Sequence, residues 1–319
     1  MKAAIVTGPG KTPIYGEFQE PQTKDGEELI HVAASALSHL TKGRAAGSHY
    51  SSTGQFPAVA GVDGVGRTSN GRRVYFVLPD APFGAMAERV AIRKQQCIPL
   101  PDEVDDLTAA AIANPGMSSW AALKERARLE AGENVLINGA TGVSGRLAVQ
   151  IAKHMGAKKV IATGRNAQAL EELKELGADV AVPLTLPAEE LEAAFREQFA
   201  GDGVHVVLDY LWGKSAETLI VAAAKADKDG VPMRYVNIGS MTGGDITLPA
   251  AALRAIDLKL MGSGIGSVSY AGLLGAIGGV MQAVVPGKLR IAAEAVPLQD
   301  VEANWNRDSG NSRVVFVVG

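Results

Sequence analysis

A turn of small side chains in the middle of the chain is the segment best suited to chemistry. Ala140-Thr141-Gly142-Val143-Ser144-Gly145 follows the apolar run NVLIN and leads into an amphipathic stretch. Its spacing is that of the dinucleotide-binding turn G-x-G-x-x-G, with Ala140 in place of the first glycine. Small residues let the backbone approach a diphosphate, whose charge the N–H groups of the following helix stabilise. Strand, turn, helix and second strand fall within about 30 residues, as this motif requires, so the segment predicts a dinucleotide site.

A basic residue stands where the second strand of this segment ends, twenty residues after Gly145. An NAD-selective site carries an acidic residue at about this distance, where it binds the ribose hydroxyls. The sequence has Gly164-Arg165-Asn166 instead, and a guanidinium favours the 2′-phosphate of NADP. The alternative is that Arg165 is a solvated residue before Asn166, the N-cap of the next helix. The spacing favours the first interpretation, so NADP(H) is the predicted cofactor.

Around the turn, apolar strands alternate with amphipathic helices. The runs NVLIN, KKVIAT, VHVVLD and RYVNI are separated by helical patterns, one of which places Leu147, Ile151 and Met155 on one face. Strands that are apolar throughout and alternate with helices describe a parallel sheet covered on both faces. We therefore expect an α/β fold with a doubly wound parallel sheet, a Rossmann cofactor domain, over residues 113–286.

The two ends of the chain have a different character. Short strands separated by turns are predicted from KAAIVT, EELIHVAA, RRVYFV and MAERVAI, and RIAAEAVPL and RVVFVV return to this pattern near the C-terminus. The second predicted domain is accordingly β-rich and is formed by residues 1–112 together with 287–319.

An uncharged, glycine-rich segment runs from Leu260 to Gly287. A membrane span is one interpretation of it. However, the helical part, Tyr270 to Val284, offers about 15 residues where a bilayer requires about 20. We expect a buried helix and no membrane partner.

Composition excludes several classes of protein. The 319 residues carry 31 basic and 34 acidic side chains, a net charge of −3, with no basic stripe for nucleic acid. The single cysteine, Cys97, cannot form an intramolecular disulfide or complete a cysteine-based zinc site, and its predicted role is that of a small buried side chain. No signal-peptide pattern opens the chain, so a cytoplasmic protein is expected.

Tyr210 and Lys214 form a literal Y-x-x-x-K, the couple of short-chain dehydrogenases. In that class a lysine lowers the pKa of a tyrosine that shares its helix face. Here Tyr210 directly follows the strand VHVVLD and Gly213 interrupts the spacing, so we interpret the match as chance.

Several longer motifs carry a family resemblance over nearly the whole chain. They are PAVAGVDGVG, NPGMSSWAAL, NGATGVSGRLAVQIAK, VVLDYLWG, VNIGSMTGG and the closing RVVFVVG. With them the chain resembles the medium-chain dehydrogenase/reductase superfamily, and most closely its zinc-free quinone oxidoreductase branch. The resemblance implies that the β-rich part is a GroES-like catalytic domain.

The same resemblance bears on metal binding. In the zinc-dependent alcohol dehydrogenases of this superfamily, catalytic zinc is held by Cys, His and Cys. Ser38, Val62 and Asn114 match those positions here, and none of them is a good zinc ligand. The resemblance therefore implies an enzyme without a metal, which reduces a quinone or an α,β-unsaturated carbonyl compound by hydride transfer from NADPH.

The resemblance also implies the roles of individual residues. Ser38 and Thr41 match positions beside the nicotinamide where the branch usually has Asn and Asp, and Tyr50 matches a tyrosine of the substrate pocket. These three are the candidate catalytic residues, although a loop tyrosine that only packs its ring is an equal interpretation of Tyr50.

Further cofactor contacts are expected at strand ends. Ser118 matches a hydroxyl of the family near the nicotinamide, and Ser240 follows a strand at the carboxyl edge of the sheet, where such folds bind ligands. Gly239 is a further candidate for cofactor contact, with buried strand from Val236 to Gly239 as the alternative interpretation. His39, next to Ser38, is a further candidate for contact with the cofactor. In the family, the positions of Asn311 and Arg313 lie near the cleft between the two domains.

Two further expectations concern function and assembly. The rival to an enzyme is a non-catalytic, NADPH-binding sensor or scaffold, which the unusual Ser38-His39-Leu40-Thr41 favours. The uncharged stretch after Leu260 is expected to pack against a second copy, so a homodimer is predicted.

Overall fold

The computed structural model describes residues 1–49, 52–226, 231–308 and 310–319, and these form two units. The first unit comprises Met1–Asn114, Val280–Val285 and Arg290–Gly319, and the second comprises Pro115–Gly279 and Pro286–Leu289. The division on the N-terminal side falls inside helix α2 (Asp106–Ala121).

The second unit is built on a parallel sheet. Among the described residues it has six strands in the order β11-β10-β9-β12-β13-β14. Their bounds are β9 (Asn134–Asn138), β10 (Lys159–Gly164), β11 (Val180–Pro183), β12 (Val206–Asp209), β13 (Met233–Asn237) and β14 (Leu258–Gly262). Every pairing is parallel, with β9 central between β10 and β12. In this order β10 and β11 are added on one side of β9, and β12, β13 and β14 on the other. Such an order is that of a doubly wound dinucleotide fold and confirms the predicted fold class.

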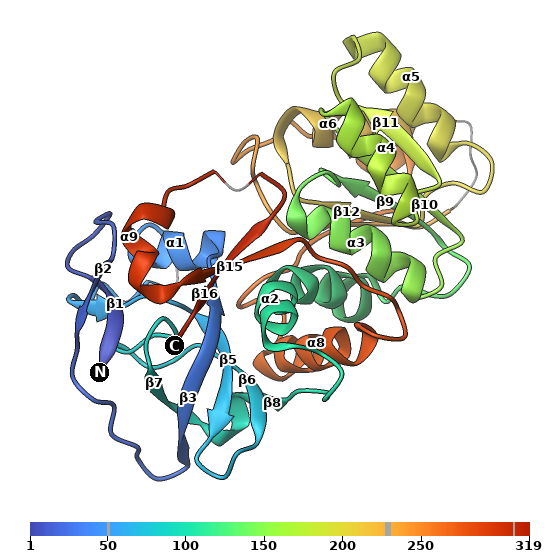
Figure 1. Cartoon of the computed structure of the whole chain (residues 1–319). Helices are drawn as coiled ribbons and strands as arrows, with labels where there is room; N and C mark the ends of the chain where they lie inside the picture. The colour runs from blue at the N-terminus through green and yellow to red at the C-terminus, as the bar shows by residue number, and fades with distance from the viewer. Residues whose placement is uncertain (50–51, 227–230, 309) are drawn as a thin grey trace. The chain divides into compact units, whose positions relative to one another are not determined.

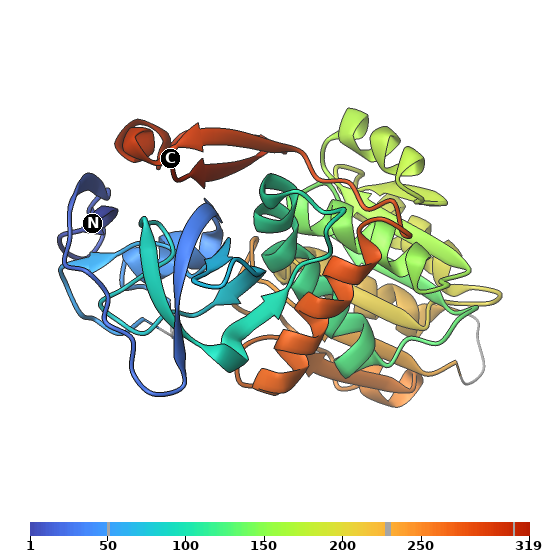
Figure 2. The same cartoon turned by 60° about the horizontal axis from the view of Figure 1, so that its bottom comes forward.

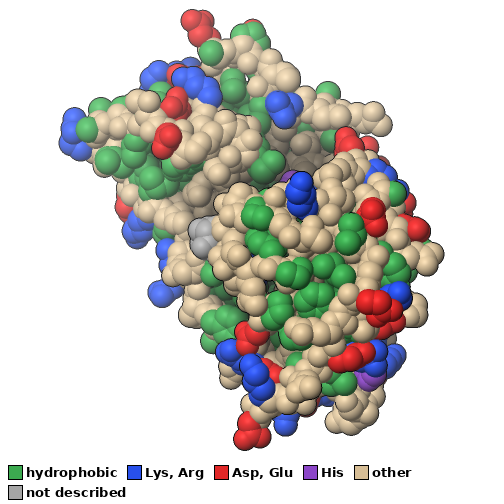
Figure 3. Space-filling view, turned by 90° about the vertical axis from the view of Figure 1, so that its left-hand side faces the viewer, with side chains coloured by type: hydrophobic (Ala, Val, Ile, Leu, Met, Phe, Trp, Pro, Cys, Tyr) green, Lys and Arg blue, Asp and Glu red, His purple; other side chains and the backbone are tan. Residues whose placement is uncertain are grey.

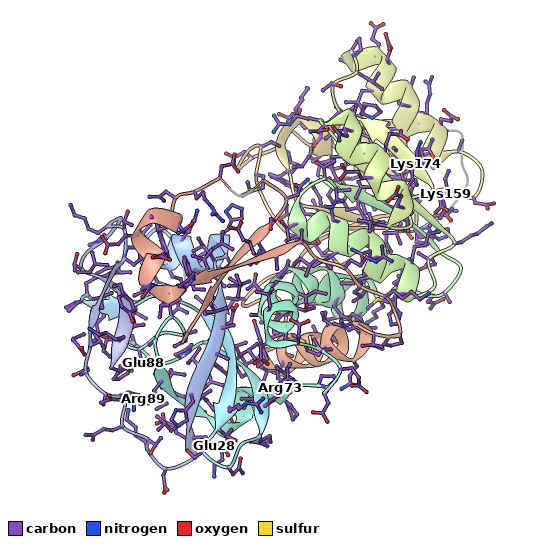
Figure 4. All side chains as sticks on the ribbon, in the orientation of Figure 1. Glu28, Arg73, Glu88, Arg89, Lys159 and Lys174 are labelled. Atoms are coloured by element: carbon purple, nitrogen blue, oxygen red, sulfur yellow. The ribbon has the colours of Figure 1, made fainter. Side chains whose placement is uncertain are left out.

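Helices cover both faces of this sheet, as its buried strands require (Figure 1). Leu191 and Phe195 of α5 pack with Leu219 of α6 against one face of the sheet, where Leu136 and Val207 point. The helices are α3 (Val143–His154), α4 (Ala167–Glu175), α5 (Ala188–Phe199), α6 (Gly213–Lys225) and α7 (Ala252–Ala255). Lys174 lies on the exposed side of α4, where it pairs with Glu171 (Figure 4).

Two helices in this part of the molecule pack on each other. Helix α8 (Tyr270–Ala283) lies beside α2 (Figure 2). Trp120 of α2 lies against Gly279 of α8, where a Cβ would come within 2.4 Å of the indole ring. A π-helical turn, η2 (Ala122–Ala127), continues α2. Helix α8 lies where a helix was predicted, but it is buried on one side only, since Tyr270, Gly275 and Gln282 are exposed. No helix in the described parts of the chain has the length and hydropathy to cross a membrane.

The first unit is mainly β-structure. A mixed sheet has the order β15-β16-β3-β5-β6-β8, with β7 also pairing with β3, and a smaller sheet has the order β2-β1-β4. Their bounds are β1 (Lys2–Val6), β2 (Ile14–Glu17), β3 (Glu27–Ala36), β4 (Ala58–Val59), β5 (Asp63–Thr68), β6 (Arg73–Val77), β7 (Arg89–Arg93), β8 (Cys97–Pro99), β15 (Ala293–Pro297) and β16 (Arg313–Val317). Antiparallel pairing of β16 with β3, in which Val315 faces Ala36, brings the C-terminal strand into the sheet formed by the first part of the chain.

Short helical segments and polar contacts complete this unit. They are α1 (His39–Ala45), η1 (Lys94–Gln96), η3 (Leu298–Asp300) and α9 (Val301–Asn304). Arg73 of β6 fixes the start of α2, because its Nη2 contacts Asp106 Oδ1 at 2.6 Å and donates to the Val104 carbonyl (Figure 4). On the face shown in Figure 3, acidic and basic side chains are interspersed, in keeping with the small net charge.

Candidate functional site

The turn between β9 and α3 has the geometry of an anion-binding loop. Gly139, which the sequence analysis passed over in favour of Ala140, has φ +88°, a conformation that glycine adopts without strain. A Cβ on Gly145 would lie 2.4 Å from the Gly139 carbonyl oxygen, so glycine is required there for helix and turn to pack closely. A Cβ on Gly142, by contrast, would have no atom of the described residues within 4 Å, so space is open above the turn.

The N-terminus of α3 opens onto this space. Gly142 is the N-cap and supplies no side chain to the first N–H groups of the helix. Within the described residues, the amides of Val143 and Ser144 have no hydrogen-bond partner. Free N–H groups at the positive end of a helix, beside a glycine that leaves room, are suited to a diphosphate. The residues therefore fit a dinucleotide, and the assignment of Ala140 to Gly145 to its binding stays a prediction.

The end of β10 lies next to this turn. Gly164 is buried, and a Cβ on it would come within 2.4 Å of the Thr141 side chain, so the two loops touch. Arg165 is exposed and makes no hydrogen bond or ion pair with any described residue. Asn166 caps α4 by accepting from the Ala169 amide at 3.0 Å, as the sequence indicated. The arrangement leaves the Arg165 guanidinium available to a ligand.

A buried aspartate at the end of β12 ties the loops of the sheet together, and sequence reasoning missed it. Asp209 accepts hydrogen bonds from Asn138 Nδ2 (2.8 Å), the Leu211 amide (2.9 Å), the Trp212 amide (3.1 Å) and the Tyr235 hydroxyl (2.8 Å). Thr163 of β10 extends the network by donating to Asn138 Oδ1. The network spans the carboxyl ends of four adjacent strands. A signal was present in the sequence, since Asn138 and Asp209 each close an apolar strand.

The loops after β12 and β13 are also joined. The Ile238 amide donates to the Asp209 carbonyl at 2.7 Å, and a Cβ on Gly239 would come within 2.8 Å of the Tyr210 carbonyl oxygen. Ser240 follows, exposed, three residues after β13 ends at Asn237. Gly239 and Ser240 therefore lie at the carboxyl edge of the sheet, and the strand ends at Asn237, before Gly239.

Tyr210 and Lys214 do not form a couple. The Tyr210 side chain is buried beside Ser118 and Ser119 of α2, and its hydroxyl meets no described partner at hydrogen-bond geometry. Burial raises the pKa of Tyr210 to about 12, which opposes ionisation. The Lys214 side chain is 88% exposed and pairs with Glu217. The Ser118 hydroxyl is engaged by the Pro115 carbonyl at 2.8 Å.

In the first unit, two of the predicted catalytic residues lie together. Ser38 is the N-cap of α1, and its Oγ accepts from the Thr41 amide at 2.9 Å. The two hydroxyls are also 2.9 Å apart, and both side chains are buried. One of the two hydroxyls therefore donates a hydrogen bond to the other, and one O–H is left for a further acceptor. Tyr50, the third predicted catalytic residue, lies outside the described residues.

A second buried aspartate belongs to the mixed sheet of this unit. Asp63, the first residue of β5, has an Oδ1 without a described partner, while its Oδ2 accepts from Asn114 Nδ2 at 3.4 Å. Burial raises the pKa of Asp63 to about 6, although Arg313 and the Tyr75 hydroxyl oppose the shift. Arg313 is itself buried, and its Nε and Nη2 atoms have no partner in the described chain. This polar cluster is incompletely hydrogen-bonded.

The positions that match zinc ligands contribute to this region. Ser38 caps α1, Val62 is a buried aliphatic residue, and Asn114 bonds Asp63. A hydroxyl, an alkyl group and an amide are a poor donor set for zinc. In the described residues no group of three or more His, Cys, Asp or Glu side chains is placed to hold a metal ion.

Two other side chains noted in the sequence have altered acidity. Burial lowers the pKa of His39, and the nearby Arg313 and Lys42 lower it further, so neutral imidazole is favoured. Cys97 lies within β8, half-buried. Burial raises the pKa of its thiol to about 11, and Glu28 adds to the shift.

Comparisons with known proteins agree with this architecture. A family model described as zinc-binding dehydrogenase matches residues 144–277, within the second unit. A protein of Emericella nidulans named a probable NADPH-dependent quinone reductase is 29% identical over 99% of this chain and 100% of its own length. A chloroplastic NADPH-dependent alkenal/one oxidoreductase of Arabidopsis thaliana is 31% identical over 52% of this chain and 47% of its own.

Among solved structures, the quinone oxidoreductase of Thermus thermophilus, also solved with NADPH, has a TM-score of 0.80 at 26% identity and covers 99% of this chain and 100% of that chain. This similarity extends over both units, as does that of the fungal relative. With the doubly wound sheet and its glycine turn, it establishes that the chain is an oxidoreductase of the medium-chain dehydrogenase/reductase superfamily, in the quinone oxidoreductase branch.

Proposed function

We propose that this chain reduces quinones or α,β-unsaturated carbonyl compounds with NADPH, by hydride transfer and without a metal. The observation that carries the proposal is the turn from Gly139 to Gly145, whose open space and unpartnered amides suit the diphosphate of a dinucleotide. The relatives named for NADPH-dependent quinone and alkenal/one reduction support the same chemistry.

In this proposal the second unit corresponds to the predicted cofactor domain. The amides of Val143 and Ser144 would bind the diphosphate, and the Asp209 network would hold the surrounding loops in place. Arg165 would select NADPH over NADH through its charge-assisted contact with the 2′-phosphate, since no described acidic group pairs with it. Gly239 and Ser240 would contribute at the strand ends.

The first unit corresponds to the predicted catalytic domain and would supply the acceptor site. NADPH, when bound, supplies the hydride; the acceptor gains that hydride and one proton, so that NADP⁺ and the reduced acceptor result. One hydroxyl of the Ser38–Thr41 pair donates to the other, and the remaining O–H would donate to the carbonyl oxygen as it gains negative charge. Tyr50 remains a candidate proton donor on the resemblance alone.

Metal-free chemistry follows from the donor set. Ser38, Val62 and Asn114 offer no thiolate, imidazole or carboxylate at the positions where zinc-dependent members bind the metal. Elemental analysis of the purified, active protein tests this part. Less than about 0.1 zinc per chain with full activity is expected, and activity lost to a chelator and restored by zinc would contradict it.

Steady-state oxidation of NADPH with a panel of quinones and enones tests the reaction itself. We expect acceptor-dependent oxidation, with one NADPH consumed for each two-electron reduction. Tight NADPH binding without oxidation by any acceptor would favour the alternative, a sensor or scaffold protein.

We also propose that the chain forms a homodimer. Strand β14 is the edge of the sheet, and Leu260 on it is 41% exposed. An exposed apolar edge strand can pair with its counterpart in a second copy. Light scattering that gives a single species of 33.1 kDa would exclude the dimer.

A further inference from the structure

A cavity of about 60 Å³ opens in the first unit beside the candidate catalytic helix α1. One water molecule occupies about 30 Å³, so the cavity admits a small group such as a carboxylate. Thr41 and Arg44 of α1 both line it, three residues apart and therefore on one side of the helix. The remaining described lining residues are uncharged and mainly apolar, among them Phe56, Val62 and Phe83.

Arg44 is the residue of this described lining that carries a charge. It is half-buried, burial lowers its pKa, and the guanidinium has no hydrogen bond or ion pair with any described side chain. A cation that is partly removed from water without a counter-ion is costly to the fold. Such a group is retained at functional sites, where a ligand can supply the missing charge.

Acidic residues are absent from the surrounding sequence. No Asp or Glu stands between Glu28 and Asp63, whereas Lys42, Arg44 and three histidines fall in that stretch. Asp80 lies between two lining residues, but its carboxylate is paired with Arg93 at 2.9 Å. Asp63 is fully buried in the cluster with Arg313. The cavity is therefore positively charged without internal compensation.

The presence of a cation at position 44 has a simpler explanation, which is its place at the C-terminal end of a helix. Arg44 lies in the last turn of α1, where backbone carbonyls favour a cation by about 0.3 to 1 kcal/mol. Lys42 shares that turn without lining the cavity, so the helix end alone gives no reason for the guanidinium to face the cavity. Lys42 is thus a matched control for the charge of Arg44.

We propose that Arg44 determines substrate specificity by binding a carboxylate on the acceptor, so that the preferred substrates are α,β-unsaturated carbonyl compounds that carry a carboxylate. The inference rests on the proposed function and names its substrate class. A planar guanidinium binds a carboxylate through two parallel hydrogen bonds, which a lysine cannot reproduce. The anchored carboxylate would direct the other end of the acceptor toward Thr41.

A matched pair of acceptors tests the proposal. The probes are trans-4-oxo-2-pentenoate and its methyl ester, which differ in charge and keep the same enone carbons. For the wild type, Arg44→Gln, Arg44→Lys and Lys42→Gln, the measured quantity is the ratio of kcat/KM for the acid to that for the ester. Taking this ratio within each protein removes differences in the intrinsic reactivity of the two probes.

We expect Arg44→Gln to lower the acid-to-ester ratio by about tenfold or more, mainly through the KM of the acid, because one charge-assisted contact is lost. Arg44→Lys should restore part of the ratio, and Lys42→Gln should keep it within about twofold. A ratio unchanged in Arg44→Gln, or lowered equally by Lys42→Gln, overturns the proposal.

Binding without turnover separates this proposal from the proposed function. Calorimetry with 4-oxopentanoate and its methyl ester, in the presence of NADP⁺, measures affinity for saturated analogues that cannot be reduced. Tighter binding of the acid that is lost in Arg44→Gln supports the role of Arg44 even if neither enone is reduced, a result that would refute only the proposed reaction. Equal binding of acid and ester by the wild type refutes the role of Arg44.

Discussion

Two buried aspartates, one in each unit, stand at the start or end of a buried strand and differ in how their carboxylates are bonded. Asp209 accepts four hydrogen bonds, two of them from backbone amides. Asp63 accepts a long hydrogen bond from Asn114 at Oδ2, and the Tyr75 hydroxyl also favours its ionised form. Its Oδ1 has no described partner, and the buried Arg313 that acts on it electrostatically has unsatisfied donors. The Asp209 carboxylate holds loops in position. The Asp63 carboxylate belongs to a cluster in which several donors and acceptors make no hydrogen bond with described residues. Incomplete bonding of this kind is expected near a functional site and costs stability.

Removal of the well-bonded carboxylate should have the largest effect. Asp209→Ala leaves one N–H of Asn138, the Tyr235 hydroxyl and two amides without an acceptor in the core, so we expect a loss of more than about 4 kcal/mol in unfolding free energy. Chemical denaturation measures it. A loss below about 1 kcal/mol would mean that the network does not hold the loops, and the contrast with Asp63 would disappear.

In the glycine turn of the second unit, Gly145 is required for packing, whereas Gly142 faces the space predicted to hold the ligand. Gly145→Ala forces a Cβ against the Gly139 carbonyl, and we expect about 3 kcal/mol of destabilisation. Gly142→Ala meets no atom of the described residues and has an ordinary φ of −77°, so its stability should change by less than about 0.5 kcal/mol, while the Kd for NADPH rises about tenfold or more. Denaturation and fluorescence titration measure the two effects. If Gly142→Ala binds NADPH normally, the turn does not hold the diphosphate.

Neutralising the Asp63 carboxylate should raise folding stability relative to the wild type as pH increases, whereas Asp209→Ala should lower folding stability. Because burial raises the pKa of Asp63 to about 6 from its ordinary 3.8, the folded state keeps a proton that the unfolded chain loses between these values. The wild type therefore loses unfolding free energy as pH rises through that window. Asn cannot titrate, so the unfolding free energy of Asp63→Asn relative to that of the wild type should rise by about 2 to 3 kcal/mol between pH 4 and pH 6. Denaturation curves at pH 4, 5, 6 and 7 measure the difference. A difference that does not vary with pH would show that this carboxylate is not destabilising.

At the rim of the second unit, Arg165→Asp should weaken NADPH binding by about tenfold or more and leave NADH binding unchanged. The guanidinium is exposed and unpaired among the described residues, so its removal should not affect folding. Titration with both cofactors decides the point. Equal affinities for NADPH before and after the change would rule out Arg165 as the selector.

The smallest effect is expected at Tyr210, a buried hydroxyl of the second unit that, unlike Asp209, lacks a described partner. Because the hydroxyl makes no hydrogen bond in the described chain, Tyr210→Phe should change stability by less than about 1 kcal/mol and leave turnover within about twofold. Loss of turnover with NADPH affinity intact would revive the Y-x-x-x-K interpretation of Tyr210 and Lys214.

Local features of the sequence predicted much of the second unit. The apolar strands β9, β10, β12 and β13, the glycine spacing and the Asn166 cap are each encoded within a few residues. Helix α2 escaped prediction because it is alanine-rich, buried around most of its circumference and contains Pro115, so its hydrophobic pattern has no helical period. Gly139 was overlooked because spacing alone does not show which residue takes a positive φ.

The polar cluster of the first unit could not be predicted for a different reason. Asp63, Asn114 and Arg313 are brought together from three distant segments of the chain by the sheet and by helix α2. No local pattern encodes such an encounter. The pairing of Ser38 with Thr41 is local, by contrast, since a serine before a helix and a hydroxyl three residues later form a capping contact.

The half-buried thiol of Cys97 has a consequence for an enzyme that handles such acceptors. Quinones and enones are electrophiles that alkylate thiolates, and a thiol with a pKa of about 11 remains almost entirely protonated at neutral pH. Since Cys97 is the sole cysteine of the sequence, we expect inactivation by addition of the electrophile to a thiol to be slow.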